Sequence, residues 1–135
     1  LISVAIVRIW QVTPFAVLIF LARLLSLPVE PYEAARVDGA SKWETFRYLT
    51  LPFLYKYIIL VVLFLSVDAM REFGTIYTMT RGGPGRATEV SSMYAYNLGF
   101  KILKMGQTYA MTHVILLLTV GIAVFILSFW KRLED

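Results

Sequence analysis

The chain has 135 residues, of which 59% are hydrophobic and only 16% are charged. A soluble domain usually carries about a quarter charged residues, so the composition excludes an ordinary soluble protein and predicts an all-α integral membrane protein. The absence of cysteine excludes disulfides and thiolate metal sites, and a net charge of +4 without a basic cluster argues against nucleic-acid binding.

Three hydrophobic segments are long enough to cross a bilayer as helices, which takes roughly 20 residues each. We expect membrane spans at residues 1–27, 53–79 and 108–130. Because the first segment begins at Leu1 without an initiator methionine, we expect the chain to be the C-terminal part of a longer membrane protein. Pro14 in the middle of this segment predicts a lost backbone hydrogen bond and a kink, with or without a functional role.

A polar and helix-prone segment, EPYEAARVDGASKWETFRYLTLP, separates the first two hydrophobic segments. Pro31 suits the first turn of a helix, and Gly39 supplies the left-handed conformation that closes it. Ser41 and Glu44 have the spacing of a capping box, which predicts a second short helix. Pro52 then ends this helix or opens the next span. The pattern predicts two short helices joined by a tight turn outside the hydrocarbon, which present a rigid surface.

Charged residues crowd the end of the second hydrophobic segment, where Asp68, Arg71 and Glu72 fall within one helical turn. Charges inside a membrane are costly, so these side chains should pair or face water. Asp68 and Arg71 are three residues apart and can meet on one helix face, either as an ion pair at the helix end or as part of a cavity lining.

A glycine-rich stretch, TRGGPGRATEVSS, follows this segment and predicts a tight, irregular loop. It lacks the Gly-Lys-Ser/Thr of a phosphate-binding loop, and no strand precedes it, so nucleotide binding is rejected. After it, the segment 89–106 predicts a short helix that lies at the membrane interface or dips inward. The single histidine, His113, is a proton-relay candidate or a hydrogen-bonded packing residue, and the second interpretation is preferred because its span has no carboxylate.

The segment EAARVDGASKWETFRYLTLP resembles the EAA motif of the permease subunits of binding-protein-dependent ABC importers. Seven positions match this motif: Glu33, Ala34, Ala35, Gly39, Leu49, Leu51 and Pro52. The longer form EAARVDGAS, together with MTRGGPGRATEV and YAYNLGF, resembles the carbohydrate-importer branch and the F-type subunit of maltose permeases in particular. Many sugar permeases have Gly-Gly-Gly-Pro in the loop, whereas Arg81 here precedes two glycines and Pro84.

The resemblance implies the C-terminal half of an ABC importer permease fold, in which the EAA helices form a cytoplasmic coupling element that docks into a separate ATPase subunit. It places the segments 28–52 and 131–135 in the cytoplasm and the segment 80–107 outside. The charges alone do not decide the orientation, because they put seven Lys and Arg on one side and six on the other. The implied coupling residues are Glu33, Ala34, Ala35, Asp38, Gly39 and Ala40.

We therefore expect a multi-pass permease subunit in the cell (inner or plasma) membrane that imports a sugar or related solute. The implied partners are an ABC ATPase subunit, a second permease subunit, an extracytoplasmic solute-binding protein and the lipid bilayer. We expect the chain itself to be no enzyme and to need no cofactor or metal, since one histidine and scattered acids offer neither a nucleophile–base pair nor a ligand set. The alternatives are an ion-coupled secondary transporter and a structural membrane scaffold.

Sugars are bound by aromatic faces and by polar groups that exchange hydrogen bonds with hydroxyls. Such side chains occur near the outward end of the second span and beyond the glycine-rich loop. We expect the substrate pathway to include Glu72, Thr75, Tyr77, Thr78 and Asn97. For Tyr77 the alternative is an ordinary interfacial aromatic residue.

Overall fold

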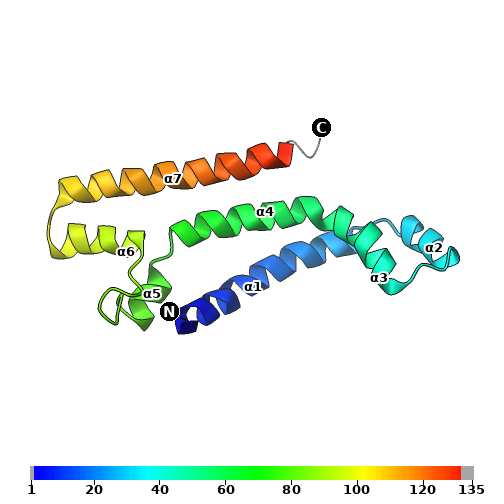
Figure 1. Ribbon diagram of the computed structural model, residues 1–135, viewed down its shortest axis with the longest axis horizontal. Coiled ribbons are helices and arrows are strands. Elements are labelled where there is room, and N and C mark those ends of the chain that lie inside the picture. Colours follow the sequence, from blue (N-terminus) through cyan, green and yellow to red (C-terminus); the bar gives the residue numbers. More distant parts are fainter. Residues whose placement is uncertain (1, 132–135) are drawn as a thin grey trace. The chain divides into compact units, whose positions relative to one another are not determined.

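The computed structural model describes residues 2–131, and every regular element in that range is helical (Figure 1). The predicted all-α class is confirmed. Residue 1 and residues 132–135 of the predicted tail at 131–135 lie outside the described residues. The elements in chain order are α1 (Ile2–Leu25), α2 (Glu30–Val37), α3 (Lys42–Thr45), the π-helical turn η1 (Phe46–Thr50), α4 (Leu51–Met70), α5 (Gly74–Met79), α6 (Ser91–Tyr96), the π-helical turn η2 (Asn97–Lys101) and α7 (Met105–Lys131).

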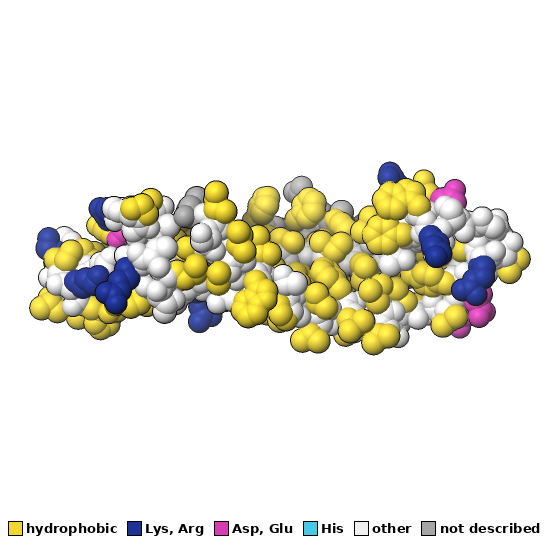
Figure 2. All heavy atoms as spheres, turned by 90° about the horizontal axis from the view of Figure 1, so that it is seen from below, with side chains coloured by type: hydrophobic (Ala, Val, Ile, Leu, Met, Phe, Trp, Pro, Cys, Tyr) yellow, Lys and Arg dark blue, Asp and Glu magenta, His cyan; other side chains and the backbone are white. Residues whose placement is uncertain are grey.

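Three helices in the described part of the chain are long and apolar enough to cross a membrane: Ile2–Leu25, Lys42–Met70 and Met105–Lys131. Their large hydrophobic side chains are widely exposed, and none of the residues of α7 is buried. On the face shown in Figure 2, hydrophobic side chains cover the long helices, while charged side chains gather at α2 and α3 and around the segment after α5. Such apolar surface requires lipid or partner helices around it, which confirms the prediction of three spanning helices.

The chain divides into two compact units. One unit contains residues 13–62, which include the end of α1, the helices α2 and α3 and the first part of α4. The other unit contains residues 1–12 together with the chain from residue 63 onward.

In the unit 13–62, the turn between α2 and α3 has both helix-end motifs that the sequence predicts. Gly39 has φ +76°, and its N–H donates to the carbonyl of Arg36 while the N–H of Ala40 donates to the carbonyl of Ala35. These two bonds make a Schellman motif, which satisfies carbonyls at the end of α2. Ser41 and Glu44 then form the predicted capping box at the start of α3. The turn is therefore fixed by hydrogen bonds on both sides.

The helix that starts at Lys42 does not end at Pro52 but continues through η1 into α4. Proline has no N–H, and its ring clashes with the carbonyl four residues earlier in a regular α-helix. In η1 the helix widens, so that the N–H of Leu51 donates to the carbonyl of Phe46, five residues before. This wider turn accommodates Pro52 without breaking the helix. The sequence predicts that Pro52 either ends this helix or opens the next span, and it lies at the start of the next span.

The core of the other unit lies where the start of α1 meets α5 and α6. Val4, Ile76 and Met93 are buried there, and Met93 is completely enclosed. The helix α6 and the turn η2 pack along the first turns of α7 (Figure 1). The backbone approaches closely at Gly99, where a Cβ atom would lie 3.0 Å from the Oγ1 of Thr108 on α7. Glycine permits this contact, as small residues do at helix crossings in membranes.

The second long helix ends earlier than the sequence suggested, because α4 stops at Met70 and a separate helix, α5, begins at Gly74. The residues between them, 71–73, form a break. The carboxylate of Glu72 accepts a hydrogen bond of 2.9 Å from the N–H of Thr75, which is one of the free donors at the start of α5. Pro14, in contrast, lies inside α1 and does not divide it.

Candidate functional site

The residues predicted for coupling lie on α2 and on the turn that follows it. Glu33, Ala34, Asp38, Gly39 and Ala40 are exposed, and Ala35 is half-buried. Val37 on the same helix has 88% of its surface exposed, so α2 offers a small apolar spot among polar side chains. Five of the six predicted residues are thus exposed, on α2 and on the turn that follows it.

A side-chain contact joins α2 to the base of the next span. The hydroxyl of Tyr32 donates to the Oγ1 of Thr50 across 3.1 Å, and both residues are half-buried. At the end of α1, the guanidinium of Arg23 lies 5.1 Å from the ring centre of Tyr57 on α4, within reach of a cation–π interaction. The first contact holds α2 of the α2–α3 corner (residues 30–50) against η1, and the second joins the end of α1 to α4.

A charged cluster lies in the other unit, where the start of α1 meets the break between α4 and α5. The guanidinium of Arg8 contacts the carboxylates of both Asp68 and Glu72, and its Nη1 lies 2.7 Å from the Oε2 of Glu72. One turn along α1, the side-chain carbonyl of Gln11 accepts a hydrogen bond of 3.0 Å from the hydroxyl of Thr75. The partner of Asp68 identified here is thus Arg8, from a different helix, whereas the sequence suggested Arg71.

Three of the five predicted pathway residues line one pocket beside this cluster. Glu72, Thr75 and Thr78 face a volume of about 530 Å³ together with Arg8, Gln11 and three apolar or small residues of α1 and α5. The pocket therefore offers a carboxylate, a guanidinium, an amide and two hydroxyls. Groups of this kind exchange hydrogen bonds with a polyhydroxylated molecule.

Tyr77 is not among the residues that line this pocket; it lies in an aromatic cluster that packs against the core of Val4, Ile76 and Met93. Its ring stacks on Phe73 at 5.0 Å between centres and meets the edge of Tyr96 at 5.5 Å. Hydrogen bonding to Tyr77 raises the pKa of Tyr96 above that of an ordinary tyrosine. The cluster continues to Phe100, whose ring lies 5.1 Å from that of Tyr96.

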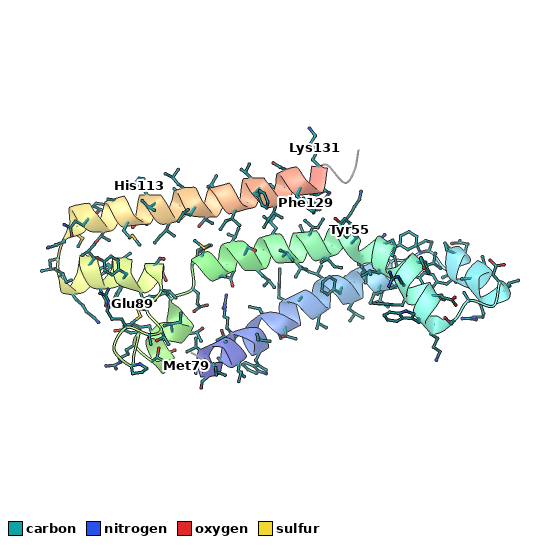
Figure 3. All side chains as sticks on the ribbon, in the orientation of Figure 1. Tyr55, Met79, Glu89, His113, Phe129 and Lys131 are labelled. Carbon is teal, nitrogen blue, oxygen red and sulfur yellow. The ribbon has the colours of Figure 1, made fainter. Side chains whose placement is uncertain are left out.

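Asn97 lines a different pocket, with Arg81, Arg86 and Glu89 of the glycine-rich loop. Its Nδ2 donates to the Oε1 of Glu89 across 3.0 Å, and its buried Oδ1 has no hydrogen-bond partner. Glu89 lies beside α6 (Figure 3), and the pKa of its carboxyl is lowered first by the hydrogen bond from Arg86 and also by the bond from Asn97. The structure thus separates Asn97 from the pocket that contains Glu72.

The glycine-rich loop is held in place by its own hydrogen bonds. The hydroxyls of Thr80 and Thr88 lie 2.7 Å apart, and the Thr88 hydroxyl also donates to the carbonyl of Gly83 across 3.0 Å. Gly82 has φ +88°, and a Cβ atom there would lie 3.2 Å from the side chain of Met93. The loop is therefore packed onto α6 rather than free.

Among residues 2–131 there is no group of three or more His, Cys, Asp and Glu that could hold a metal ion. His113 on α7 (Figure 3) is exposed, and its Nδ1 lies 2.8 Å from the carbonyl oxygen of Tyr109. Sequence reasoning missed Arg8 and Gln11 as members of the polar site. Their signal was present as two polar side chains three residues apart in an otherwise apolar segment, which puts them on one helix face.

Comparisons with known proteins agree with this architecture. The chain is 44% identical over 121 residues to a probable ABC transporter permease protein of Sinorhizobium fredii, which covers 90% of this chain and 39% of the relative. It is 43% identical over 95 residues to the trehalose/maltose transport system permease protein MalF of Thermococcus litoralis, covering 70% of this chain and 32% of the relative.

A third relative is the sulfoquinovosyl glycerol transport system permease protein of Agrobacterium fabrum, which is 35% identical over 117 residues, covering 87% of this chain and 38% of the relative. The matched part of the chain spans 32% to 39% of the length of these relatives. Residues 1–134 match the model of one family. The chain belongs to the family of binding-protein-dependent transport system inner membrane components, and is thus a multi-pass membrane protein of the ABC permease type.

Proposed function

We propose that this chain forms the part of an ABC importer permease that transmits the work of a separate ATPase subunit to the passage of a sugar or related solute. Family membership supports this function. Two relatives carry names that refer to trehalose/maltose transport and to sulfoquinovosyl glycerol transport, which favours a carbohydrate-like solute. The ion-coupled transporter considered above is not favoured, since the relatives are named as ABC or transport-system permeases.

The observation that carries the proposal is the construction of the α2–α3 corner. Its turn is closed by a Schellman motif and a capping box, and α3 continues into α4 without a non-helical residue. A docking element must transmit the movement of the ATPase to the spanning helices. A corner whose turn is fixed by hydrogen bonds at both helix ends deforms little when it transmits this movement. We assign the ATPase contact to the exposed coupling surface of Glu33, Ala34, Ala35, Asp38, Gly39 and Ala40, on the cytoplasmic side.

The partners in this proposal are an ABC ATPase, a second permease subunit and an extracytoplasmic solute-binding protein. ATP hydrolysis belongs to the ATPase in this scheme. The family description itself names dependence on a binding protein.

For the solute pathway we propose the pocket of Glu72, Thr75 and Thr78, and we propose that Tyr77 of the same helix, α5, contributes its aromatic ring. Hydroxyl-rich solutes suit a wall that combines donors and acceptors with an aromatic face. Asn97 remains in the proposal as a lining residue of the separate pocket beside the glycine-rich loop. In this proposal the glycine-rich loop lies on the extracytoplasmic side.

The coupling assignment is tested at Gly39. A Cβ atom there meets nothing within 4 Å, so only the positive φ restricts the residue. Gly39→Pro imposes a φ near −65° and disrupts the turn, whereas Gly39→Asn tolerates the left-handed conformation. We expect Gly39→Pro to lose the ATPase subunit in a pull-down while the membrane subunits still assemble, and Gly39→Asn to retain it. Normal ATPase recovery with Gly39→Pro would remove the coupling assignment.

A further inference from the structure

Two pockets of opposite chemistry adjoin at the α2–α3 corner. One has a volume of about 390 Å³ and is lined by Arg36, Lys42 and five other residues of the corner. The other, of about 300 Å³, is lined mainly by the apolar end of α1 and the segment that follows it. Tyr32 and Thr50 line both pockets, and their hydroxyls are hydrogen-bonded to each other.

The first pocket suits an anion. Its two charged lining residues, Arg36 and Lys42, are both cations, and no carboxylate is among the residues that line it. Tyr32, Thr45 and Thr50 add hydroxyl groups. Cations combined with hydroxyl donors are a favourable environment for phosphate oxygens.

The second pocket suits hydrocarbon. Leu24, Leu27, Pro28 and Val29 supply four of its six lining residues. Leu24 and Val29 have 41% and 63% of their surfaces exposed, so this wall is apolar surface that residues 2–131 leave partly uncovered. A free phosphate ion would make no use of such a wall, whereas an acyl chain would bury it.

The position of the two pockets is that of a membrane–water boundary. α1 ends at Leu25, directly before the apolar pocket, and the helix that contains α4 begins at Lys42. Trp43 and Tyr48 are 66% and 70% exposed at this helix end. Exposed Trp and Tyr together with Lys and Arg at a helix end are typical of the headgroup level.

We propose that the α2–α3 corner binds an anionic phospholipid, with the headgroup phosphate between Arg36 and Lys42 and the first part of an acyl chain against Leu27 and Val29. The lipid touches both sides of the Tyr32–Thr50 contact, so its binding holds α2 against the base of α4. This site is separate from the solute pocket. It shares Ala40 with the proposed ATPase contact, but its cations and its apolar wall lie outside that set. Basic pockets beside membrane helices bind such headgroups by the same chemistry.

The test is native mass spectrometry of the chain purified in detergent and titrated with phosphatidylglycerol. We expect one tightly held lipid, and we expect Arg36→Gln and Lys42→Gln to weaken it about fivefold each, which corresponds to about 1 kcal/mol per cation. Arg47→Gln is the matched control, because Arg47 is exposed on η1 but lines neither pocket. Equal lipid retention in all three variants would overturn the proposal. Arg36 and Lys42 are exposed, so either single variant suffices if the other is poorly produced.

Three further ligands separate a lipid from other occupants. Phosphatidylcholine should bind more weakly than phosphatidylglycerol, because its headgroup has no net charge. Glycerophosphoglycerol and inorganic phosphate should compete poorly, because they lack the acyl chain. Val29→Ser should weaken phosphatidylglycerol and leave glycerophosphoglycerol unchanged. Binding of phosphatidylcholine or inorganic phosphate as tight as that of phosphatidylglycerol would contradict an anionic lipid site.

Discussion

Arg8 on α1 and Glu72, in the break between α4 and α5, form an ion pair in which Nη1 and Oε2 lie 2.7 Å apart. The carboxylate side chain of Glu72 is 14% exposed and the side chain of Arg8 is 27% exposed, so water screens the pair only partly. Asp68 contacts the same guanidinium. One cation therefore compensates two carboxylates beside the pocket that we assign to the solute.

Arg8→Gln should destabilise the folded chain, because it leaves Asp68 and Glu72 facing each other without their cation. We expect a loss of about 1–3 kcal/mol, below the value for a fully buried pair because the site is partly exposed. Thermal unfolding in detergent measures the loss, with Lys104→Gln as a control at an exposed cation. Adding Glu72→Gln to Arg8→Gln should recover part of the stability, and strict additivity of the two changes would contradict the pair.

Glu33→Lys should weaken ATPase docking less than Gly39→Pro does. Glu33 lies in the first turn of α2, where a negative side chain is favoured and a positive one is disfavoured by about 0.3–1 kcal/mol. The change leaves the Schellman turn intact. The measurement is the amount of ATPase recovered at increasing salt, with Glu33→Gln as the variant that removes the charge without reversing it. Recovery with Glu33→Lys equal to that of the unchanged chain would exclude Glu33 from the contact.

Tyr77→Ala should lower solute uptake per assembled complex if the Tyr77 ring contributes to the solute pathway. The ring also packs on Phe73 and Tyr96, so the alanine variant should assemble less well in any case. Uptake must therefore be divided by the amount of complex recovered. Tyr77→Phe retains the ring packing and removes only the hydroxyl, which serves as the comparison. Uptake per complex unchanged in the alanine variant would make Tyr77 a packing residue alone.

Gly99→Ala should destabilise the contact between η2 and α7. The added Cβ would lie 3.0 Å from the Oγ1 and 3.1 Å from the Cγ2 of Thr108, so the two helices would have to move apart. Thr108→Ala removes both of these atoms and should restore the stability of Gly99→Ala. Thermal unfolding of the two single variants and the double variant measures this. Gly121→Ala is a suitable control, because a Cβ atom at Gly121 meets nothing within 4 Å.

The features that the sequence predicted well are local. The left-handed Gly39 and the Ser41–Glu44 capping box depend on residues within one helical turn, so their spacing alone specifies them. The features that it missed depend on contacts between distant segments. Nothing adjacent to Asp68 indicated that Arg8, on another helix, would reach it, and the placement of Asn97 with Glu89 depends on how the glycine-rich loop packs.

The end of α4 at Met70 belongs to the same class, because hydropathy does not distinguish one long helix from two helices with a capped break. The hydrogen bond from the N–H of Thr75 to the Glu72 carboxylate stabilises the start of the second helix and so favours the break. The sequence pattern of charged residues does not indicate which group the Glu72 carboxylate contacts. The local structure follows from the order of the residues, whereas the polar sites follow from packing.

The π-helical turn at Phe46–Thr50 also changes which residues share a face of the helix around it. A regular α-helix rotates by about 100° per residue, and a π turn takes up about one additional residue. A helical wheel drawn through Lys42–Met70 with a constant angle therefore places Trp43 on the wrong side relative to the residues of α4. The side of α3 available to a docking partner is therefore rotated relative to the side of α4 available to lipid by about the angle of one residue. Deleting one residue from this turn would realign them, and Pro52 would then have to sit within a regular helix.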